Sequence, residues 1–197
     1  MEAVTALLAA DPDLAGVVQR CGLPDPIFRE PGFATLLHII FEQQVSLASA
    51  QATFDKVQAS LDELNPRSYL RLSDQQLRAA GVSRQKARYS RLVAEAILDE
   101  SFPIAGLAAL SDEAARDALL ALTGVGHWTA DVYLMVALGR EDCWPVGDLA
   151  LQKAVADIKT LEWPLAKGQL ERLGERYRPY RSVATRIFWH HYLSAGS

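Results

Sequence analysis

The 197-residue sequence contains little cysteine, the residue on which disulfide-rich secreted proteins and metal-cluster proteins depend. It has only two cysteines, Cys21 and Cys143, far apart in the chain. Two thiols exclude a four-cysteine iron–sulfur or zinc site and favour a reduced, cytosolic setting. No apolar run approaches the length of a membrane-spanning helix, and the start, MEAVTALLAADPDLAG, lacks the basic segment of a secretory signal. We therefore expect a cytoplasmic protein that does not associate with membranes.

The sequence also lacks an excess of positive charge. Twenty Lys and Arg residues face 24 Asp and Glu residues, which gives a net charge of −4. This balance argues against a protein that coats nucleic acid indiscriminately, but it leaves room for a DNA enzyme with local basic patches. With 50% hydrophobic residues, the chain is able to bury a sizeable core, as one domain or as two closely packed lobes.

Signals for β-strands are missing, and the fold class that we predict is all-α. Alanine and leucine recur at helical spacing, and Phe33, Leu36, Leu37, Ile40 and Phe41 mark one apolar helix face. Several runs are preceded by serines suited to helix N-caps, namely Ser73, Ser83 and Ser111. We expect helices over residues 5–10, 14–21, 33–46, 74–80, 84–100, 112–122, 127–138, 148 onwards, 165–177 and 182–195.

A very short glycine turn at residues 122–126 joins two of these helices. Glycines at such a turn permit positive φ angles and a close approach by another backbone. The helix that follows presents unpaired N–H groups at its start, which suit a phosphate. From the glycines alone, a hairpin that serves only helix packing is the stronger alternative.

The residues around the turn change this balance. The stretch LTGVGHWTA at residues 122–130, followed by PVGD at residues 145–148, resembles the helix-hairpin-helix motif of the DNA glycosylase superfamily. Thr123 replaces the proline of that motif. Further blocks resemble the 3-methyladenine DNA glycosylase II (alkylpurine) branch over nearly the whole chain: QQVS at residues 43–46, residues 77–97, RPYRSVA at residues 178–184, and IFW at residues 187–189.

The resemblance implies a helix-hairpin-helix glycosylase fold of two helical lobes with an active cleft between them. We expect a middle lobe at residues 31–145, and a second lobe built from residues 1–30 and 146–197. It also implies a monomer of bacterial, nucleoid-associated type, whose partner is double-stranded DNA that contains alkylated bases.

The resemblance further implies a monofunctional enzyme. Superfamily members that also cut the strand carry a lysine where this chain has Trp128, and without that amine no Schiff base forms, so no AP lyase activity is expected. Trp128 and Trp189 would form the walls of the base pocket, because indole faces attract the positive charge of an alkylated purine. The alternative is that both are core aromatics. Val132 and Leu149 stand where some relatives have pocket tyrosines.

Asp148 is the expected catalytic residue. It follows Gly147 at the start of a helix, where a carboxylate is favoured in its charged form. Such a charge would stabilise the developing cation of the sugar or activate a water, and the sequence does not choose between these roles. A purely structural cap is the alternative. We interpret Asp131 as a residue of a helix surface and Asp142 as a loop charge.

The remaining predicted site residues would hold DNA. They are Gly124, Val125, Gly126, His127 and Thr129 of the hairpin, the wedge candidate Gln44 with Gln43 behind it, and the basic residues Arg84, Lys86 and Arg181. Ordinary solvated helix faces are the alternative for the polar and basic side chains. No cofactor is required. The resemblance suggests a structural monovalent cation on the carbonyls of Leu120, Leu122 and Val125.

The sequence therefore predicts a base excision repair hydrolase that flips out alkylated purines, 3-methyladenine and 7-methylguanine, and hydrolyses their N-glycosidic bonds. Two alternatives stay open. One is a glycosylase of the same fold for deaminated or oxidised bases, and the other is a non-catalytic helix-hairpin-helix module that only binds DNA.

Overall fold

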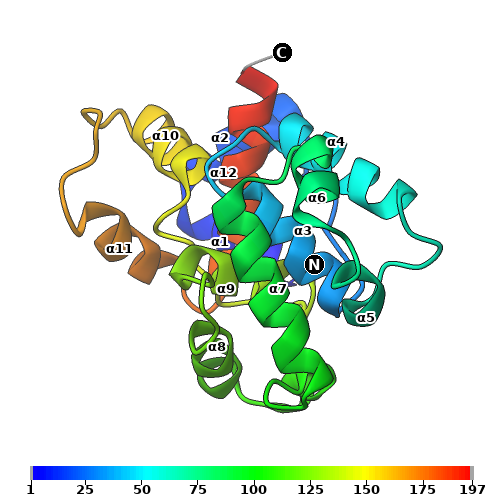
Figure 1. The fold of residues 1–197 in the computed structure, drawn as a ribbon. Coiled ribbons are helices and arrows are strands. Elements are labelled where there is room, and N and C mark those ends of the chain that lie inside the picture. The colour runs from blue at the N-terminus through cyan, green and yellow to red at the C-terminus, as the bar shows by residue number, and fades with distance from the viewer. Residues whose placement is uncertain (1, 196–197) are drawn as a thin grey trace. The chain divides into compact units, whose positions relative to one another are not determined.

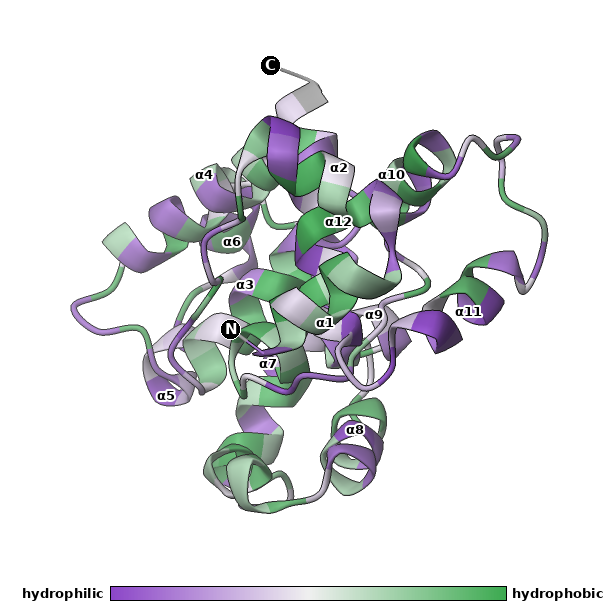
Figure 2. Cartoon of the chain, turned by 180° about the vertical axis from the view of Figure 1, so that it is seen from behind, coloured by the Kyte–Doolittle hydropathy of each residue, from purple (hydrophilic) through white to green (hydrophobic). Residues whose placement is uncertain are grey.

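A computed structural model of the chain describes residues 2–195 and contains helices, turns and loops but no strand within that range. This confirms the predicted all-α class. None of the helices in this range is long and apolar enough to cross a membrane. Figure 1 labels the helices along the chain, and Figure 2 shows purple and green residues on the same helix in α8 and α11, as expected for elements that bury one face.

The chain divides into two compact units, residues 1–28 with 139–197, and residues 29–138. The sequence suggested boundaries at residues 31 and 145 instead. The second boundary lies earlier because residues 140–143 are bound to the first unit through its last helix. Ser182 Oγ donates to the Arg140 carbonyl (2.7 Å), and the Cys143 amide donates to Ser182 Oγ (2.9 Å).

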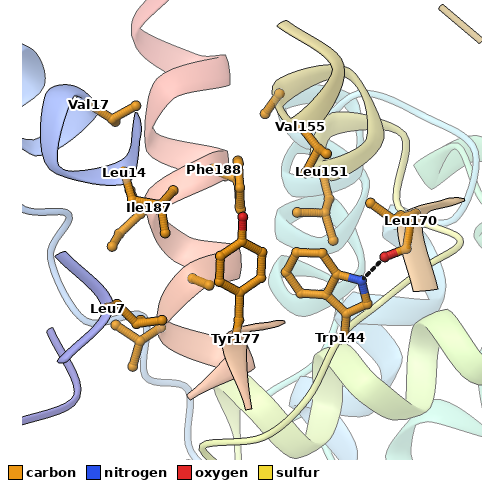
Figure 3. Packing of buried hydrophobic residues seen from close by; sticks show 13 residues of the cluster. Leu7, Leu14, Val17, Trp144, Leu151, Val155, Leu170, Tyr177, Ile187 and Phe188 are labelled. Carbon is orange, nitrogen blue, oxygen red and sulfur yellow. Dashed lines mark hydrogen bonds between the residues drawn. The ribbon is translucent and has the colours of Figure 1, made fainter. Parts of the chain in front are cut away.

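The first unit contains α1 (Glu2–Ala10), α2 (Pro12–Cys21), α10 (Leu149–Ile158), α11 (Gln169–Gly174), the 3₁₀ turn η2 (Glu175–Tyr177) and α12 (Arg181–Ala195). Its core joins residues far apart in sequence (Figure 3). The rings of Trp144, Tyr177 and Phe188 pack with centroids 5.6–6.1 Å apart. The Trp144 indole N–H donates to the Leu170 carbonyl (3.0 Å), so the buried ring leaves no polar atom unsatisfied.

Gly174 lies directly against that indole. A Cβ at this position would come within 2.5 Å of Trp144 Nε1, which is shorter than any ordinary contact. Only glycine therefore lets α11 end against the Trp144 ring. The expected helix over residues 165–177 is in fact the shorter pair α11 and η2, because Gly168 takes a left-handed conformation (φ 72°) just before α11 begins.

A buried ion pair ties the N-terminal helices to the rest of this unit. Asp11 caps α2 and is 4% exposed. Lys159 Nζ lies 2.7 Å from both Asp11 carboxylate oxygens, and the Tyr177 hydroxyl donates to Oδ2 (2.9 Å). Burial alone would raise the pKa of Asp11, but these two hydrogen bonds outweigh it and hold the pKa below its ordinary value.

The second unit contains α3 (Phe33–Glu42), α4 (Leu47–Ala59), α5 (Pro66–Tyr69), α6 (Asp74–Ala80), α7 (Arg84–Leu98), the 3₁₀ helix η1 (Ile104–Ala109), α8 (Asp112–Leu120) and α9 (His127–Val136). Its core is centred on α3 and α9, which are buried almost all round. The side chains of Ser73, Ser83 and Ser111 cap α6, α7 and α8, as the sequence predicts.

Two sequence expectations for the second unit are wrong. Residues 43–46 do not continue a long helix; they form the turn between α3 and α4, in which Gln44 is left-handed (φ 58°) and Ser46 caps α4. Asp131 does not lie on a helix surface: it is 7% exposed, and its Oδ1 accepts from Arg116 Nε at 2.9 Å. Burial of a carboxylate requires such a partner, and Arg116 on α8 supplies it.

Candidate functional site

The glycine hairpin between α8 and α9 is a tight turn that only glycine can form. The Val125 amide donates to the Leu122 carbonyl (3.1 Å), and Gly124 has a φ of 91°. A Cβ on Gly124 would overlap the ring of Tyr89, which packs on it from α7. Both the positive φ and the close aromatic neighbour therefore require glycine at position 124.

The same hairpin begins α9 without a side-chain cap. Gly126 is the N-cap residue, and as a glycine it has no side chain that could accept from the first amides of α9. Gly126 and His127 are exposed, whereas Val125 is 6% exposed and Thr129 is 1% exposed. Of the five hairpin residues predicted to contact DNA, the structure thus puts Gly126 and His127 at the surface and the side chains of Val125 and Thr129 in the interior.

Gln43 braces this hairpin from the end of α3. Its side-chain Nε2 donates to the Gly124 carbonyl (3.0 Å) and to Thr129 Oγ1 (2.9 Å). The amide group is therefore occupied inside the unit. Gln44, the next residue, is exposed at the tip of the turn in its left-handed conformation. The turn that carries Gln44 and the hairpin are thus joined by the Gln43 side chain.

Trp128 is the second residue of α9 and is partly buried. It follows the exposed His127 by one residue and precedes the run of buried residues that begins at Thr129. The side chain is therefore neither a fully buried core aromatic nor a fully exposed one.

Asp148 caps α10, as the sequence predicts. Its Oδ1 accepts from the Leu151 amide (2.7 Å), and its own amide donates to the Pro145 carbonyl (2.8 Å). Gln152 Nε2 donates to the Val146 carbonyl (2.8 Å), which closes the loop onto the first turn of α10. The loop and the helix start together fix the backbone of Asp148, whose side chain is partly buried.

Trp189, on α12 of the same unit, lies beside Asp148. Its indole Nε1 donates to Asp148 Oδ1 at 3.0 Å. The fold therefore brings these two residues, which are 41 positions apart in the sequence, into direct contact. The sequence assigned both to one site, but it gave no sign of a hydrogen bond between them.

Arg181 has a different environment from the one that the sequence suggests. Its guanidinium makes an ion pair with Asp142 (Nε to Oδ1 2.6 Å) and donates to the Asp142 carbonyl (3.0 Å). Arg178 also contacts the Asp142 carboxylate (2.7 Å). With 14% side-chain exposure, Arg181 mainly holds residues 140–143, the segment that leads to Asp148. Asp142 is thus a structural anchor, a role that the sequence does not reveal.

The basic side chains of α7 also differ in their exposure and in their partners. Arg84 and Arg88 are exposed on the first half of the helix. Lys86 Nζ instead donates to the Phe41 carbonyl at the end of α3 (2.7 Å), and burial lowers the pKa of its amine. Arg91 donates to the carbonyls of Leu70 and Leu72. Of the predicted pair Arg84 and Lys86, only Arg84 therefore points its charge to solvent.

The metal site that the resemblance suggests would be built from main-chain carbonyls of the hairpin. Within residues 2–195, no group of three or more His, Cys, Asp or Glu side chains is placed to hold a metal ion. The Leu122 carbonyl already accepts from Val125, although a carbonyl oxygen has a second lone pair. Neutral carbonyl oxygens are suitable ligands for a hard monovalent cation, so the donor set of Leu120, Leu122 and Val125 fits such an ion.

A cavity of about 380 Å³ opens near the hairpin in the second unit, between α7, residues 101–103 and the end of α8. Its lining is mostly apolar and comes from Leu92, Ala96, Phe102, Ala118 and Leu122 among others. Neither Trp128 nor any titratable side chain lines it, so it supplies no groups for catalysis.

Comparison with known proteins identifies the family. Residues 37–179 match the model of the HhH-GPD superfamily base excision DNA repair proteins. Over 95% of its length the chain is 31% identical to a protein of Mycobacterium tuberculosis named as a probable bifunctional transcriptional activator/DNA repair enzyme AlkA. The chain spans 39% of the length of that relative.

Two solved structures have the same fold. A DNA-3-methyladenine glycosidase from Bacillus halodurans superimposes with a TM-score of 0.76 at 29% identity, covering all of this chain and 91% of the other. The 3-methyladenine DNA glycosylase Mag1 of Schizosaccharomyces pombe, solved with abasic DNA, gives a TM-score of 0.85 at 22% identity, covering 96% and 95%. The family match covers the hairpin, Trp128 and Asp148 together, and the chain belongs to the HhH-GPD superfamily of base excision DNA repair proteins.

Proposed function

We propose that the protein is a monofunctional DNA glycosylase that removes alkylated purines, 3-methyladenine and 7-methylguanine, from double-stranded DNA. Its relatives named as 3-methyladenine glycosylases support this substrate class. The observation that carries the proposal is Asp148: one carboxylate, anchored by the start of α10 and by Trp189, in a chain of this family.

In the proposed reaction Asp148 faces the deoxyribose of the damaged nucleotide. The bond between C1′ and the purine nitrogen breaks, and its electron pair leaves with the base. Because an alkylated purine is already cationic, it departs as a neutral molecule and needs no general acid. The Asp148 carboxylate stabilises the positive charge that develops on the sugar. A water oxygen then bonds to C1′ and loses a proton, to Asp148 or to solvent.

Selection of the base is assigned to Trp128. A cation held over an indole face gains roughly 0.5–2 kcal/mol, and a neutral, undamaged purine gains less from the same surface. Trp128 also defines what the enzyme cannot do, because a tryptophan offers no amine for a Schiff base. The enzyme should therefore leave an intact abasic site and no strand break.

Binding of the duplex is assigned to the hairpin and to exposed arginines. The start of α9, whose N-cap Gly126 has no side chain, would receive a phosphate, and Arg84 and Arg88 would contact the backbone without reading sequence. Gln44, exposed at the tip of its turn, would fill the gap that the flipped base leaves. A monovalent cation on the hairpin carbonyls would add positive charge near that phosphate. We further propose that the protein acts as a monomer on chromosomal DNA in the bacterial cytoplasm, without another cofactor.

The test is product analysis on defined DNA. The purified full chain is incubated with genomic DNA treated with a methylating agent, and released bases are identified by mass spectrometry. We expect 3-methyladenine and 7-methylguanine, with Asp148→Asn as the inactive reference and no adduct trapped by borohydride. Release of uracil or 8-oxoguanine instead would indicate a different lesion class. Binding of branched or abasic DNA without any base release would instead indicate a non-catalytic DNA-binding module.

A further inference from the structure

We propose that Trp189 is a positioning residue for Asp148, and not only an aromatic wall of the base pocket. The indole N–H of Trp189 holds the carboxylate of Asp148 in one orientation. This inference rests on the proposed function of Asp148. It gives α12 a role in orienting the catalytic carboxylate, which an aromatic surface that only stacks on the base would not have.

The contact is direct and lies within one compact unit. Trp189 Nε1 donates to Asp148 Oδ1 at 3.0 Å, and the Leu151 amide donates to the same oxygen at 2.7 Å. Both residues belong to the first unit, and both are partly buried. Trp189 also packs against the core cluster of that unit, next to the fully buried Phe188, so the indole itself has little freedom to move.

The second donor changes what the helix cap alone provides. A capping aspartate with one hydrogen bond can rotate about its last side-chain bond and exchange its two oxygens, because that torsion is soft. Two N–H groups that converge on Oδ1 from different helices fix both the oxygen and the plane of the carboxylate. A charge that must face a developing cation on a sugar gains most from such preorganisation.

The two roles of Trp189 predict different results. A wall that only stacks on the base requires a flat aromatic surface, and removal of the N–H would leave that surface intact. A positioning donor requires the N–H itself. The bicyclic analogue benzothienylalanine, in which sulfur replaces the indole N–H, separates these roles with almost no change in shape.

The kinetic experiment places benzothienylalanine at position 189 by amber suppression in the full chain. Because a hydrogen bond to a charged acceptor contributes more than a neutral one, we expect the single-turnover rate on 3-methyladenine DNA to fall about 10- to 100-fold. Affinity for abasic-site DNA should change by less than about twofold, since binding does not need the carboxylate oriented. A rate within twofold of the unmodified enzyme would overturn the inference.

A matched control is available in the same unit. Trp144 donates its indole N–H to the Leu170 carbonyl, a purely structural contact. The same replacement at position 144 should lower thermal stability and leave the single-turnover rate of the folded protein unchanged. If both replacements reduced the rate equally, a general structural effect would explain the loss and the inference would be rejected.

A spectroscopic measurement keeps this inference separate from the proposed function. The chain has four tryptophans, so its ¹⁵N–¹H spectrum contains four indole signals that substitution can assign. In Asp148→Ala, the Trp189 indole signal should move and its proton should exchange faster with solvent, whereas the Trp144 signal stays in place. An unmoved Trp189 signal overturns the inference. Lack of base release by the unmodified protein would instead overturn the proposed function, and the spectrum would still decide the contact.

Discussion

The starts of α9 and α10 differ in the residue at the N-cap position. Each helix begins with backbone amides that have no partner in their own helix. At α10 the carboxylate of Asp148 accepts from one of them, while at α9 the N-cap is Gly126, which has no side chain to do so. One helix start thus holds an anion of the protein itself, and the other is left able to receive an anion from a ligand.

The difference shows how one kind of element can serve two purposes. Because a helix N-terminus favours negative charge, α10 helps to keep a carboxylate ionised and α9 would attract a phosphate. The residue at the N-cap decides between them: aspartate fills the position, and glycine leaves it open. Changes at these two positions and at their supports should therefore have separate consequences for catalysis, folding and DNA binding.

The largest effect is expected at the filled helix start. Asp148→Asn removes the charge but keeps an oxygen that can cap α10, so stability should be nearly unchanged. Loss of an electrostatic stabiliser of this kind costs roughly 10²–10³-fold in rate, and we expect a loss at the upper end. Single-turnover base release and thermal unfolding measure the two quantities. Turnover above a few per cent of the original would remove Asp148 from its catalytic role.

Asp11 provides the matched control, because it caps α2 in the same unit but serves only structure. Its pKa is held below the ordinary value by Lys159 and Tyr177, so its contribution is present at neutral pH and is lost as the pH falls through the folded-state pKa, below about pH 4. Asp11→Asn should therefore lower stability at pH 7 by about 1.5–3 kcal/mol and flatten its acid dependence. Urea unfolding between pH 3 and pH 7 checks this. Base release by the folded variant should be unaffected.

At the open helix start, the two glycines should differ sharply. Gly124→Ala combines a positive φ with a collision against Tyr89, and we expect a destabilisation of about 2–4 kcal/mol. Gly126→Ala meets no atom within 4 Å at a φ of −101°, and alanine is only a poorer N-cap residue than glycine, so stability should fall by about 0.5–1 kcal/mol. Denaturant unfolding compares the two variants. Equal losses of stability in the two variants would contradict this explanation, because the positive φ and the Tyr89 contact at Gly124 would then have no effect of their own.

The support of the hairpin should have an intermediate effect. Gln43→Leu removes two hydrogen bonds and leaves the Gly124 carbonyl and Thr129 hydroxyl without this donor, which should cost about 1–3 kcal/mol. A double-mutant cycle with Thr129→Val isolates the side-chain pair. Additive effects of the two substitutions would mean that the Gln43–Thr129 contact contributes no coupling energy.

The smallest effect is expected for a single phosphate contact. Arg84→Gln should weaken binding to abasic-site DNA a few-fold and reduce the slope of log affinity against log salt by about 1. Lys86→Gln, whose charge is held on the Phe41 carbonyl, should leave that slope unchanged. Fluorescence anisotropy at several salt concentrations measures both. The same loss of slope in the two variants would place Lys86 on the DNA as well.

Much of this molecule can be predicted from local sequence because local chemistry determines it. Capping residues such as Ser83, Ser111 and Asp148 mark where helices begin, and each one caps the expected helix. The helical class and the hairpin follow from the same short-range signals. The exception is residues 43–46, where helical spacing suggested continuity and the left-handed Gln44 interrupts it.

Side-chain partners far apart in sequence could not be predicted. Arg181 and Lys86 are residue types that commonly contact phosphates. Their charged groups are instead bound by the Asp142 carboxylate and the Phe41 carbonyl, 39 and 45 residues away. The sequence around Asp131 is typical of a helix surface. In the folded chain, however, the packing of α8 on α9 brings Arg116 against its carboxylate. Which charges are exposed is decided by tertiary contacts, and a single sequence carries little record of them.

The contact between Trp144 and Gly174 also limits how this chain can evolve. Because no side chain fits between the α11 backbone and the indole, a larger residue at position 174 is acceptable only after position 144 has lost its tryptophan. A smaller ring at 144 would in turn abandon the bond to Leu170 and open space beside Tyr177. Homologous sequences should therefore show these two sites exchanging size together, and a homologue with Trp at one and a bulky residue at the other should be missing.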